Sequence, residues 1–273
     1  MGLHPEPVGG SRQGSGRTGG TRYHEVAARR SGAAVAEIAP MADVDIVWFP
    51  LDRPSPDDER LLSCDELARA DRFRFARERH RYITGRAQLR RLLSDRCGTP
   101  AALLEFTLGA QGKPALVGQP DVDFNISHGD GTALLALSTG CTVGIDIEPE
   151  NPGIARSGIA EHFFAPGEID HLSSVPEEDQ DHAFLECWTR KEAYLKGKGG
   201  GLSLPLDGFE VSFGPGLPAR LIRADTDPSD CMSWTLVDLT PNVPGGFVAA
   251  LAVHAPVGGF NLNIISQGLG GDT

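Results

Sequence analysis

The chain shows one order of predicted secondary structure twice: a strand, then helices, then strands. The periods of apolar residues and the turn residues between them indicate which segments are strands and which are helices. In the first half, the predicted strands cover residues 44–52, 104–109, 122–127 and 132–138, and the predicted helices cover residues 55–73 and 76–98. In the second half, the predicted strands cover residues 142–148, 209–213, 233–239 and 246–254, and the predicted helices cover residues 154–164, 166–172 and 179–196. This order predicts an α+β protein of two similar α/β halves joined near residue 141.

Two local features of this prediction concern caps and turns. Ser55 or Asp57 is expected to cap the first helix, because both are good N-cap residues ahead of an apolar helical pattern. Residues 132–138 and 142–148 are expected to pair as an antiparallel hairpin around the turn at Thr139–Gly140.

The first 40 residues contain eight glycines and no strand or helix periodicity. They predict a disordered extension, or a translation start assigned too far upstream, with Met41 as the alternative start. The predicted N-terminal lobe then covers residues 41–141 and the predicted C-terminal lobe covers residues 142–258. Residues 259–273 are expected to form a tail.

The charge of the chain argues against a general nucleic-acid binder, because the formal net charge is −12. The segment Arg69–Arg96 is an exception, with ten arginines against only Asp71, Glu78 and Asp95. Such a basic segment on an acidic protein suggests a small anionic ligand. The alternative is one solvated, arginine-rich helix face.

Cysteine usage and hydropathy indicate the compartment. The five cysteines are widely spaced and form no C-x-x-C motif, which argues against disulfides or a zinc site and favours a reducing cytoplasm. No apolar run reaches the length of a membrane span, and the N-terminus lacks the apolar centre of a signal peptide. We expect a cytoplasmic monomer that contacts neither membrane nor nucleic acid.

The segment VGIDIEP places two carboxylates on one face of a predicted strand. Asp146 and Glu148 are two residues apart and share a face, while Ile145 and Ile147 point into a core. Adjacent carboxylates repel each other unless a cation lies between them, and hard oxygen ligands suit Mg²⁺. The motif alone is also compatible with an ordinary strand that has a polar outer face.

The chain has only four lysines, and three of them lie within eight residues. On the predicted helix 179–196, Trp188, Glu192 and Lys196 fall on one stripe at intervals of four residues. The stripe is compatible with a functional carboxylate and ammonium; the alternative is a surface ion pair worth about a few tenths of a kcal/mol. Ser127 and His128 are adjacent, which excludes a hydrolase triad, and Lys113 precedes a proline in a turn.

Taken together, these side chains describe phosphoryl chemistry without a covalent nucleophile, and the chain has neither a Walker loop nor a kinase signature. Three motifs in this order resemble the 4′-phosphopantetheinyl transferases: FNISHG, VGIDIE and WTRKEAYLKGKGGGLSLPLDGF. The chain is similar to the long two-lobed type that activates surfactin synthetase, and not to the short trimeric acyl-carrier-protein synthase. The resemblance covers residues 43–255. Gly129 departs from it, because the second motif often has serine there.

The resemblance implies a fold and a reaction. It implies two lobes related by a pseudo-twofold axis, with coenzyme A in the cleft between them. It implies transfer of 4′-phosphopantetheine from coenzyme A to a serine of an apo acyl or peptidyl carrier protein, with release of adenosine 3′,5′-bisphosphate. Such carriers serve fatty-acid, polyketide and nonribosomal-peptide synthesis.

The resemblance also implies roles for individual residues. Asp146, Glu148 and Glu192 would hold Mg²⁺, or Mn²⁺, on the pyrophosphate. Glu192 would accept the serine proton, directly or through water, and Lys196 would stabilise charge on the phosphate. The residues expected to bind the coenzyme A phosphates are Lys113, Ser127, His128, Arg81 and Arg69. A direct role of Lys191, and a loop contact of Lys198, stay open.

Two other functions fit the same residues. One is a module that binds coenzyme A or a carrier without transferring anything. The other is a metal-dependent phosphohydrolase, which would release phosphopantetheine with no carrier present.

Overall fold

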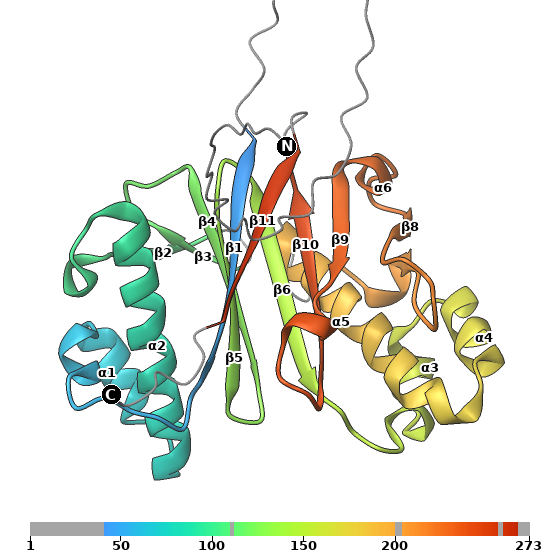
Figure 1. The fold of residues 1–273 in the computed structure, drawn as a ribbon, viewed down its shortest axis with the longest axis horizontal. Helices are drawn as coiled ribbons and strands as arrows, with labels where there is room; N and C mark the ends of the chain where they lie inside the picture. Colours follow the sequence, from blue (N-terminus) through green and yellow to red (C-terminus); the bar gives the residue numbers. More distant parts are fainter. Residues whose placement is uncertain (1–40, 110–111, 200–203, 256–258, 267–273) are drawn as a thin grey trace, which may run out of the picture. The chain divides into compact units, whose positions relative to one another are not determined.

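The computed structural model describes residues 41–109, 112–199, 204–255 and 259–266 (Figure 1). The predicted N-terminal extension, residues 1–40, lies outside the described residues. The strands are β1 (Ala42–Pro50), β2 (Phe106–Leu108), β3 (Pro114–Leu116), β4 (Val122–Gly129), β5 (Thr132–Thr139), β6 (Thr142–Pro149), β7 (Phe209–Val211), β8 (Leu221–Ala224), β9 (Trp234–Asp238), β10 (Phe247–His254) and β11 (Phe260–Ser266). The helices are α1 (Cys64–Ala70), α2 (Ala76–Cys97), α3 (Ala160–Phe163), α4 (Pro166–Ser174), α5 (Gln180–Lys198) and α6 (Asp230–Ser233).

Two sheets form the centre of the fold. The larger sheet has the order β11-β1-β5-β4, and the smaller sheet has the order β6-β10-β9. All pairs in these sheets are antiparallel except β1 with β11. Two short ribbons, β2-β3 and β7-β8, complete the strands of the described residues. The mixed α and β content confirms the predicted α+β character.

Three buried clusters join these elements into four layers, with α2 outside the larger sheet and α5 outside the smaller one (Figure 1). Leu89 and Leu93 of α2 pack on one face of β5. On the opposite face of β5, Leu134 and Ala136 pack against β6. Successive side chains of β5 therefore point alternately into two different cores, because both faces of the strand are buried. The third cluster lies between α5 and the outer face of the smaller sheet.

The predicted hairpin of residues 132–138 with 142–148 is wrong. β5 pairs with β1 and β4, whereas β6 pairs with β10 in the facing sheet. The chain crosses between the sheets near Gly140, which has a φ of +82°. β5 is apolar on both faces, and β6 is apolar on the face that carries Val143, Ile145 and Ile147. The two strands therefore bury more apolar area by packing face to face than by pairing edge to edge. The true hairpin is β4–β5, closed by Asp130 and Gly131 at positive φ.

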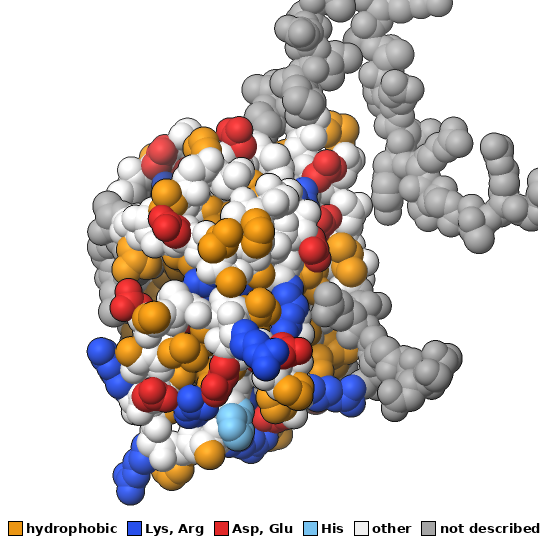
Figure 2. Space-filling model, turned by 90° about the vertical axis from the view of Figure 1, so that its left-hand side faces the viewer, with side chains coloured by type: hydrophobic (Ala, Val, Ile, Leu, Met, Phe, Trp, Pro, Cys, Tyr) orange, Lys and Arg blue, Asp and Glu red, His pale blue; other side chains and the backbone are white. Residues whose placement is uncertain are grey.

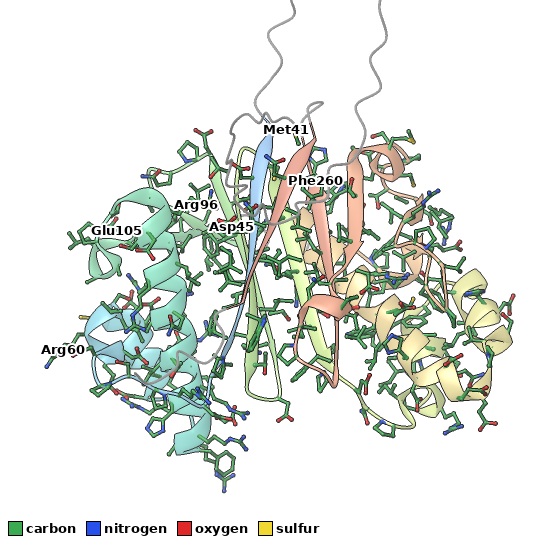
Figure 3. All side chains as sticks on the ribbon, viewed as in Figure 1. Met41, Asp45, Arg60, Arg96, Glu105 and Phe260 are labelled. Atoms are coloured by element: carbon green, nitrogen blue, oxygen red, sulfur yellow. The ribbon has the colours of Figure 1, made fainter. Side chains whose placement is uncertain are left out.

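Residues 259–273 contain a strand where we predicted a tail. β11 runs parallel to β1 at the edge of the larger sheet, with Phe260 opposite Ala42 (Figure 3). The chain thus returns from the second half to the sheet of the first half. The sequence signal for this strand is the alternation of Phe260, Leu262 and Ile264 with Asn261 and Asn263, which has the period of a strand.

Two helix predictions change in detail. Ser63 caps α1, in place of Ser55 or Asp57: its side chain accepts from the backbone N–H of Glu66, whose carboxylate accepts in return from the Ser63 backbone N–H. The predicted helix 154–164 is reduced to a 3₁₀ turn and the short α3, because Gly158 adopts a left-handed φ of +79° between them.

Most of the basic segment is neutralised by carboxylates. The pairs are Arg77 and Arg81 with Asp52, Arg79 with Glu59 and Asp71, Arg86 and Arg90 with Glu66, Arg91 with Asp58, and Arg96 with Asp45. Figure 2 shows Lys and Arg mixed with Asp and Glu on the α1–α2 side of the molecule, and Figure 3 shows Asp45 of β1 close to Arg96 of α2. The segment is thus mainly an ion-paired helix surface, and Arg69 has no acidic partner within 4.0 Å among the described residues.

Side chains rather than a backbone ladder join the two sheets at β4 and β6. Asp123 accepts from the backbone N–H of Val143 at 2.7 Å, and Asn125 accepts from that of Ile145 at 2.9 Å. Ser127, two residues further on the same face of β4, donates to Asp146 at 2.8 Å. Alternate residues of β4 therefore set the position of β6, including its carboxylates.

Candidate active site

A close approach between β6 and α5 brings the two main motifs together. A Cβ atom on Gly144 would lie 2.1 Å from the carbonyl oxygen of Ala193, and one on Gly197 would lie 2.6 Å from the ring of Trp234. Both contacts are too short for any side chain. The glycines of VGIDIE and of the helix end are therefore required for this packing, which places Asp146 beside the last turns of α5.

The predicted stripe of α5 faces this strand. Trp188, Glu192 and Lys196 line one cavity of about 340 Å³ together with Asp146 and Glu148. Ile126, Ser127 and His128 of β4 complete the lining. The structure therefore brings the three expected metal ligands, the expected catalytic residues and two of the expected phosphate-binding residues into one place.

Lys196 forms its ion pair across the cavity and not along its helix. Its Nζ donates to Asp146 Oδ1 at 2.5 Å and to Ser127 Oγ at 3.0 Å. The surface pair with Glu192 that the spacing allows does not form within 4.0 Å in the described structure, because Asp146 takes the ammonium. Strand β4, strand β6 and helix α5 thus meet at one hydrogen-bonded triangle.

The carboxylates of the cavity repel one another. Burial and the neighbouring Asp146 raise the pKa of Glu148 to about 7, and Lys196 only partly opposes this. Burial and Asp146 likewise raise the pKa of Glu192. Such an environment is typical of carboxylates that bind a cation or accept a proton near neutral pH.

The residues present fit a divalent cation. Asp146 Oδ2 is buried and has no hydrogen-bond partner, although a lone buried carboxylate oxygen is costly. Oxygen donors at this place suit Mg²⁺ or Mn²⁺. No group of three His, Cys, Asp or Glu side chains is arranged as a ready-made metal cage among the described residues, so a cation here would need further ligands from water or a substrate.

The raised pKa of Glu148 predicts that the stability of the fold depends on pH. The folded state holds this proton more tightly than the unfolded state, so the free energy of unfolding falls as pH rises from about 4.5 to about 7. Gln at this position cannot ionise, so Glu148→Gln should not lose this part of the free energy of unfolding. In metal-free buffer, we expect its melting temperature to match that of the wild type near pH 4.5 and to exceed it at pH 8. A difference that does not change with pH would contradict the prediction.

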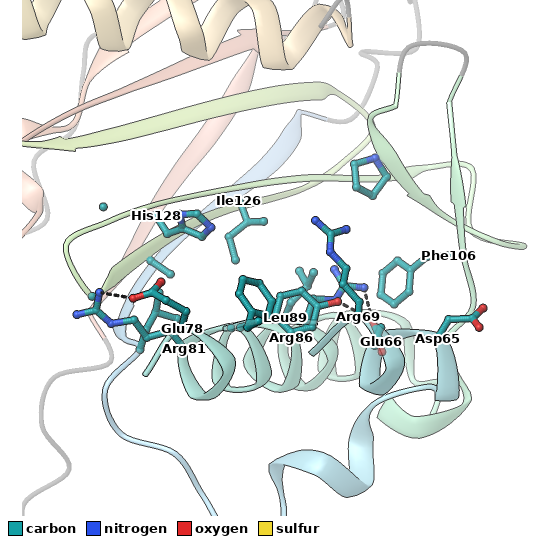
Figure 4. Close-up of a pocket in the computed structure, with 18 of the residues that line it drawn as sticks. Asp65, Glu66, Arg69, Glu78, Arg81, Arg86, Leu89, Phe106, Ile126 and His128 are labelled. Carbon is teal, nitrogen blue, oxygen red and sulfur yellow. Dashed lines mark hydrogen bonds and ion pairs between the residues drawn. The ribbon is translucent and has the colours of Figure 1, made fainter. Parts of the chain in front are cut away.

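A larger cavity of about 610 Å³ opens next to the first, and Ile126 and His128 line both. Figure 4 shows these two side chains facing α2 across the cavity. Arg81 lies at one end, and Arg69 lies with Phe106 toward the other (Figure 4). Gly129 also lines it; a Cβ there would lie 2.9 Å from a ring carbon of Pro149, which accounts for glycine in place of the usual serine.

Lys113 lines neither of these two cavities. Its Nζ donates to Asp123 at 2.5 Å and to the carbonyl oxygens of Val143 at 2.9 Å and Gly197 at 3.5 Å. It thereby ties β4, β6 and the end of α5. The expectation that Lys113 binds a coenzyme A phosphate stays a prediction, and the structure offers a competing role.

Lys113→Met separates these roles. We expect the free energy of unfolding to fall by about 1–3 kcal/mol, because Asp123 loses a charged partner in a half-buried place. The Kd for coenzyme A, measured by calorimetry, should stay unchanged. A Kd raised about tenfold at unchanged stability would instead support the prediction that Lys113 binds a phosphate of coenzyme A.

The patterns on the sequence did not reveal how two groups of residues support the elements of the site. Asp123 and Asn125 position β6, and the only signal was the alternation of polar residues in VDFNIS. Lys191 is fully buried, with Nζ donating to Glu168 at 2.5 Å and to the carbonyl oxygen of Phe209 at 2.6 Å. It holds α5 to α4 and β7, so it does not line the cavity.

The facing sheets of this α+β fold place three carboxylates and a lysine at the junction of β4, β6 and α5, and such side chains suit phosphoryl-transfer chemistry. The family model described as "4′-phosphopantetheinyl transferase superfamily" matches residues 142–252, and the model for the N-terminal part of 4′-phosphopantetheinyl transferases matches residues 47–140. The chain belongs to the 4′-phosphopantetheinyl transferase family, which confirms the resemblance of its motifs.

Curated relatives agree with this assignment. The chain is 36% identical over 220 residues to 4′-phosphopantetheinyl transferase HetI of Nostoc sp., which covers 78% of this chain and 89% of the relative. It is 31% identical over 166 residues to 4′-phosphopantetheinyl transferase Sfp of Bacillus subtilis, covering 59% and 73%. It is 39% identical over 123 residues to 4′-phosphopantetheinyl transferase AcpT of Escherichia coli K12, covering 45% and 59%.

Proposed function

We propose that the protein transfers the 4′-phosphopantetheine group of coenzyme A to a serine of an apo-carrier protein and releases adenosine 3′,5′-bisphosphate. The observation that carries the proposal is the triangle of Lys196, Asp146 and Ser127, set in a cavity with Glu148 and Glu192. These groups can hold phosphate oxygens and receive a proton, and family membership names the group that is moved.

In the proposed reaction Glu192 accepts the proton of the carrier serine, directly or through water. Its raised pKa makes it a better base near neutral pH than an exposed carboxylate. Lys196 stabilises negative charge on the phosphate group, and Ser127 orients the lysine. Asp146, Glu148 and Glu192 would hold Mg²⁺, which when bound supplies charge neutralisation at the pyrophosphate.

Coenzyme A would occupy the two adjoining cavities. The larger one offers Arg69 and Arg81 for phosphates and Phe106 as an apolar surface. His128 stands where the two cavities meet, and Ser127 lies in the smaller one, so both are placed to contact the pyrophosphate.

We further propose that the two halves, residues 41–141 and 142–258, are related by a pseudo-twofold axis. Each contributes three strands of one central sheet and one long outer helix, α2 or α5. The enzyme would act as a monomer in the cytoplasm. None of the helices in the described part of the chain is long and apolar enough to cross a bilayer.

The direct test is intact mass spectrometry on a panel of apo-carriers incubated with coenzyme A and Mg²⁺. We expect one or more carriers to gain the mass of one phosphopantetheine. EDTA should stop the gain, and Mg²⁺ or Mn²⁺ should restore it, because the cavity carboxylates would lose their cation. Modification at an undiminished rate in the chelator would reject the metal part of the proposal.

The same assay separates the other functions. A module that only binds would retain coenzyme A in calorimetry without changing any carrier. A phosphohydrolase would release free phosphopantetheine in the absence of a carrier. Either result would reject the transferase proposal.

A further inference from the structure

Lys196 and Asp146 differ in their freedom to move. Asp146 lies within β6, and its side chain is 2% exposed. Lys196 lies two residues before the end of α5 on a flexible four-carbon stem, and its side chain is 30% exposed. The carboxylate is therefore fixed, whereas the ammonium can leave it toward the open side of the cavity.

The two oxygens of Asp146 are used unequally. Oδ1 accepts from both Lys196 and Ser127, while Oδ2 has no partner. A divalent cation that approaches Oδ2 meets the ammonium on the other oxygen of the same carboxyl group. Repulsion between such close charges is screened weakly, because the carboxylate is buried.

We propose that Lys196 couples metal binding to coenzyme A binding: its ammonium opposes a divalent cation at Asp146 until the phosphates of coenzyme A draw it away. The inference rests on the proposed function for the identity of the anionic substrate. Because linkage is reciprocal, the metal then strengthens coenzyme A binding by the same factor as coenzyme A strengthens metal binding.

Titration of the full chain with Mn²⁺ tests the coupling without any transfer step. Loss of the electron paramagnetic resonance signal of free Mn²⁺ reports binding, after subtraction of the Mn²⁺ bound by coenzyme A alone. For the wild type, we expect weak binding that coenzyme A tightens. Lys196→Met keeps the stem and removes the charge, so we expect it to bind Mn²⁺ without coenzyme A about tenfold more tightly than the wild type does, a coupling of ordinary size.

Lys198→Met is the matched control, because it removes the same charge two residues along the helix, where the ammonium is held by Asp230 at 2.6 Å. It should bind Mn²⁺ like the wild type. Adding Asp146→Asn to Lys196→Met should abolish the gain in affinity, which places the metal at this carboxyl group.

Equal Mn²⁺ affinity of the wild type and Lys196→Met would overturn the inference. An equal gain in Lys198→Met would overturn it too, because the effect would then be general electrostatics. Failure to modify any carrier, together with a retained gain in Lys196→Met and no gain in Lys198→Met, would reject the transferase proposal and support the inference about Lys196.

Discussion

Asp146→Asn should lower the rate of carrier modification by about 10³-fold or more, because it removes the negative charge of a proposed metal ligand and of the ion pair that holds Lys196. The amide has almost the shape of the carboxylate and keeps one oxygen for Ser127 and Lys196. The measurement is the initial rate of mass gain on an apo-carrier at saturating coenzyme A and Mg²⁺.

The same variant should be at least as stable as the wild type. The substitution removes a buried charge whose Oδ2 has no partner, and it relieves the repulsion that raises the pKa of Glu148 and Glu192. Glu150→Gln, just beyond β6 and exposed, is the control and should change neither rate nor melting temperature. A rate loss that accompanies a large fall in melting temperature would instead assign Asp146 a structural role.

Lys191→Ala should produce a large loss of stability, about 3–5 kcal/mol in the free energy of unfolding. The side chain is fully buried, so its removal leaves Glu168 as an uncompensated charge beneath α4. Urea denaturation measures the loss. Lys198→Ala is the comparison, and it should cost less because Lys198 is 25% exposed and Tyr194 still donates to Asp230.

A double variant shows whether the charge is the cause. Lys191→Met with Glu168→Gln removes both charges and leaves Gln able to accept from the backbone N–H of Val211. We expect it to regain a large part of the lost stability. A double variant as unstable as Lys191→Ala would mean that the hydrogen bond from Lys191 to the carbonyl oxygen of Phe209, and not the ion pair, holds α5 to β7.

Local patterns predicted the elements of the site well. The period of α5 placed Trp188, Glu192 and Lys196 on one stripe, and the period of β6 placed Asp146 and Glu148 on one face. Both predictions depend only on residues within a few positions of each other, for which backbone geometry sets the direction of each side chain. Element ends that depend on one turn or cap, such as Ser63 at α1, were harder to place because neighbouring residues offer equivalent caps.

The sequence by itself determined which residues share a face, and through its motifs the family. Only the tertiary structure decided what those faces meet. Lys196 could pair with Glu192 four residues away, yet it pairs with Asp146, 50 residues away, because Gly144 and Gly197 let β6 and α5 approach closely. Likewise β5 and β6, three residues apart in the chain, lie in facing sheets because the one apolar face of β6 packs on an apolar face of β5. Such choices depend on the packing of residues that are distant in the chain, which no local period encodes.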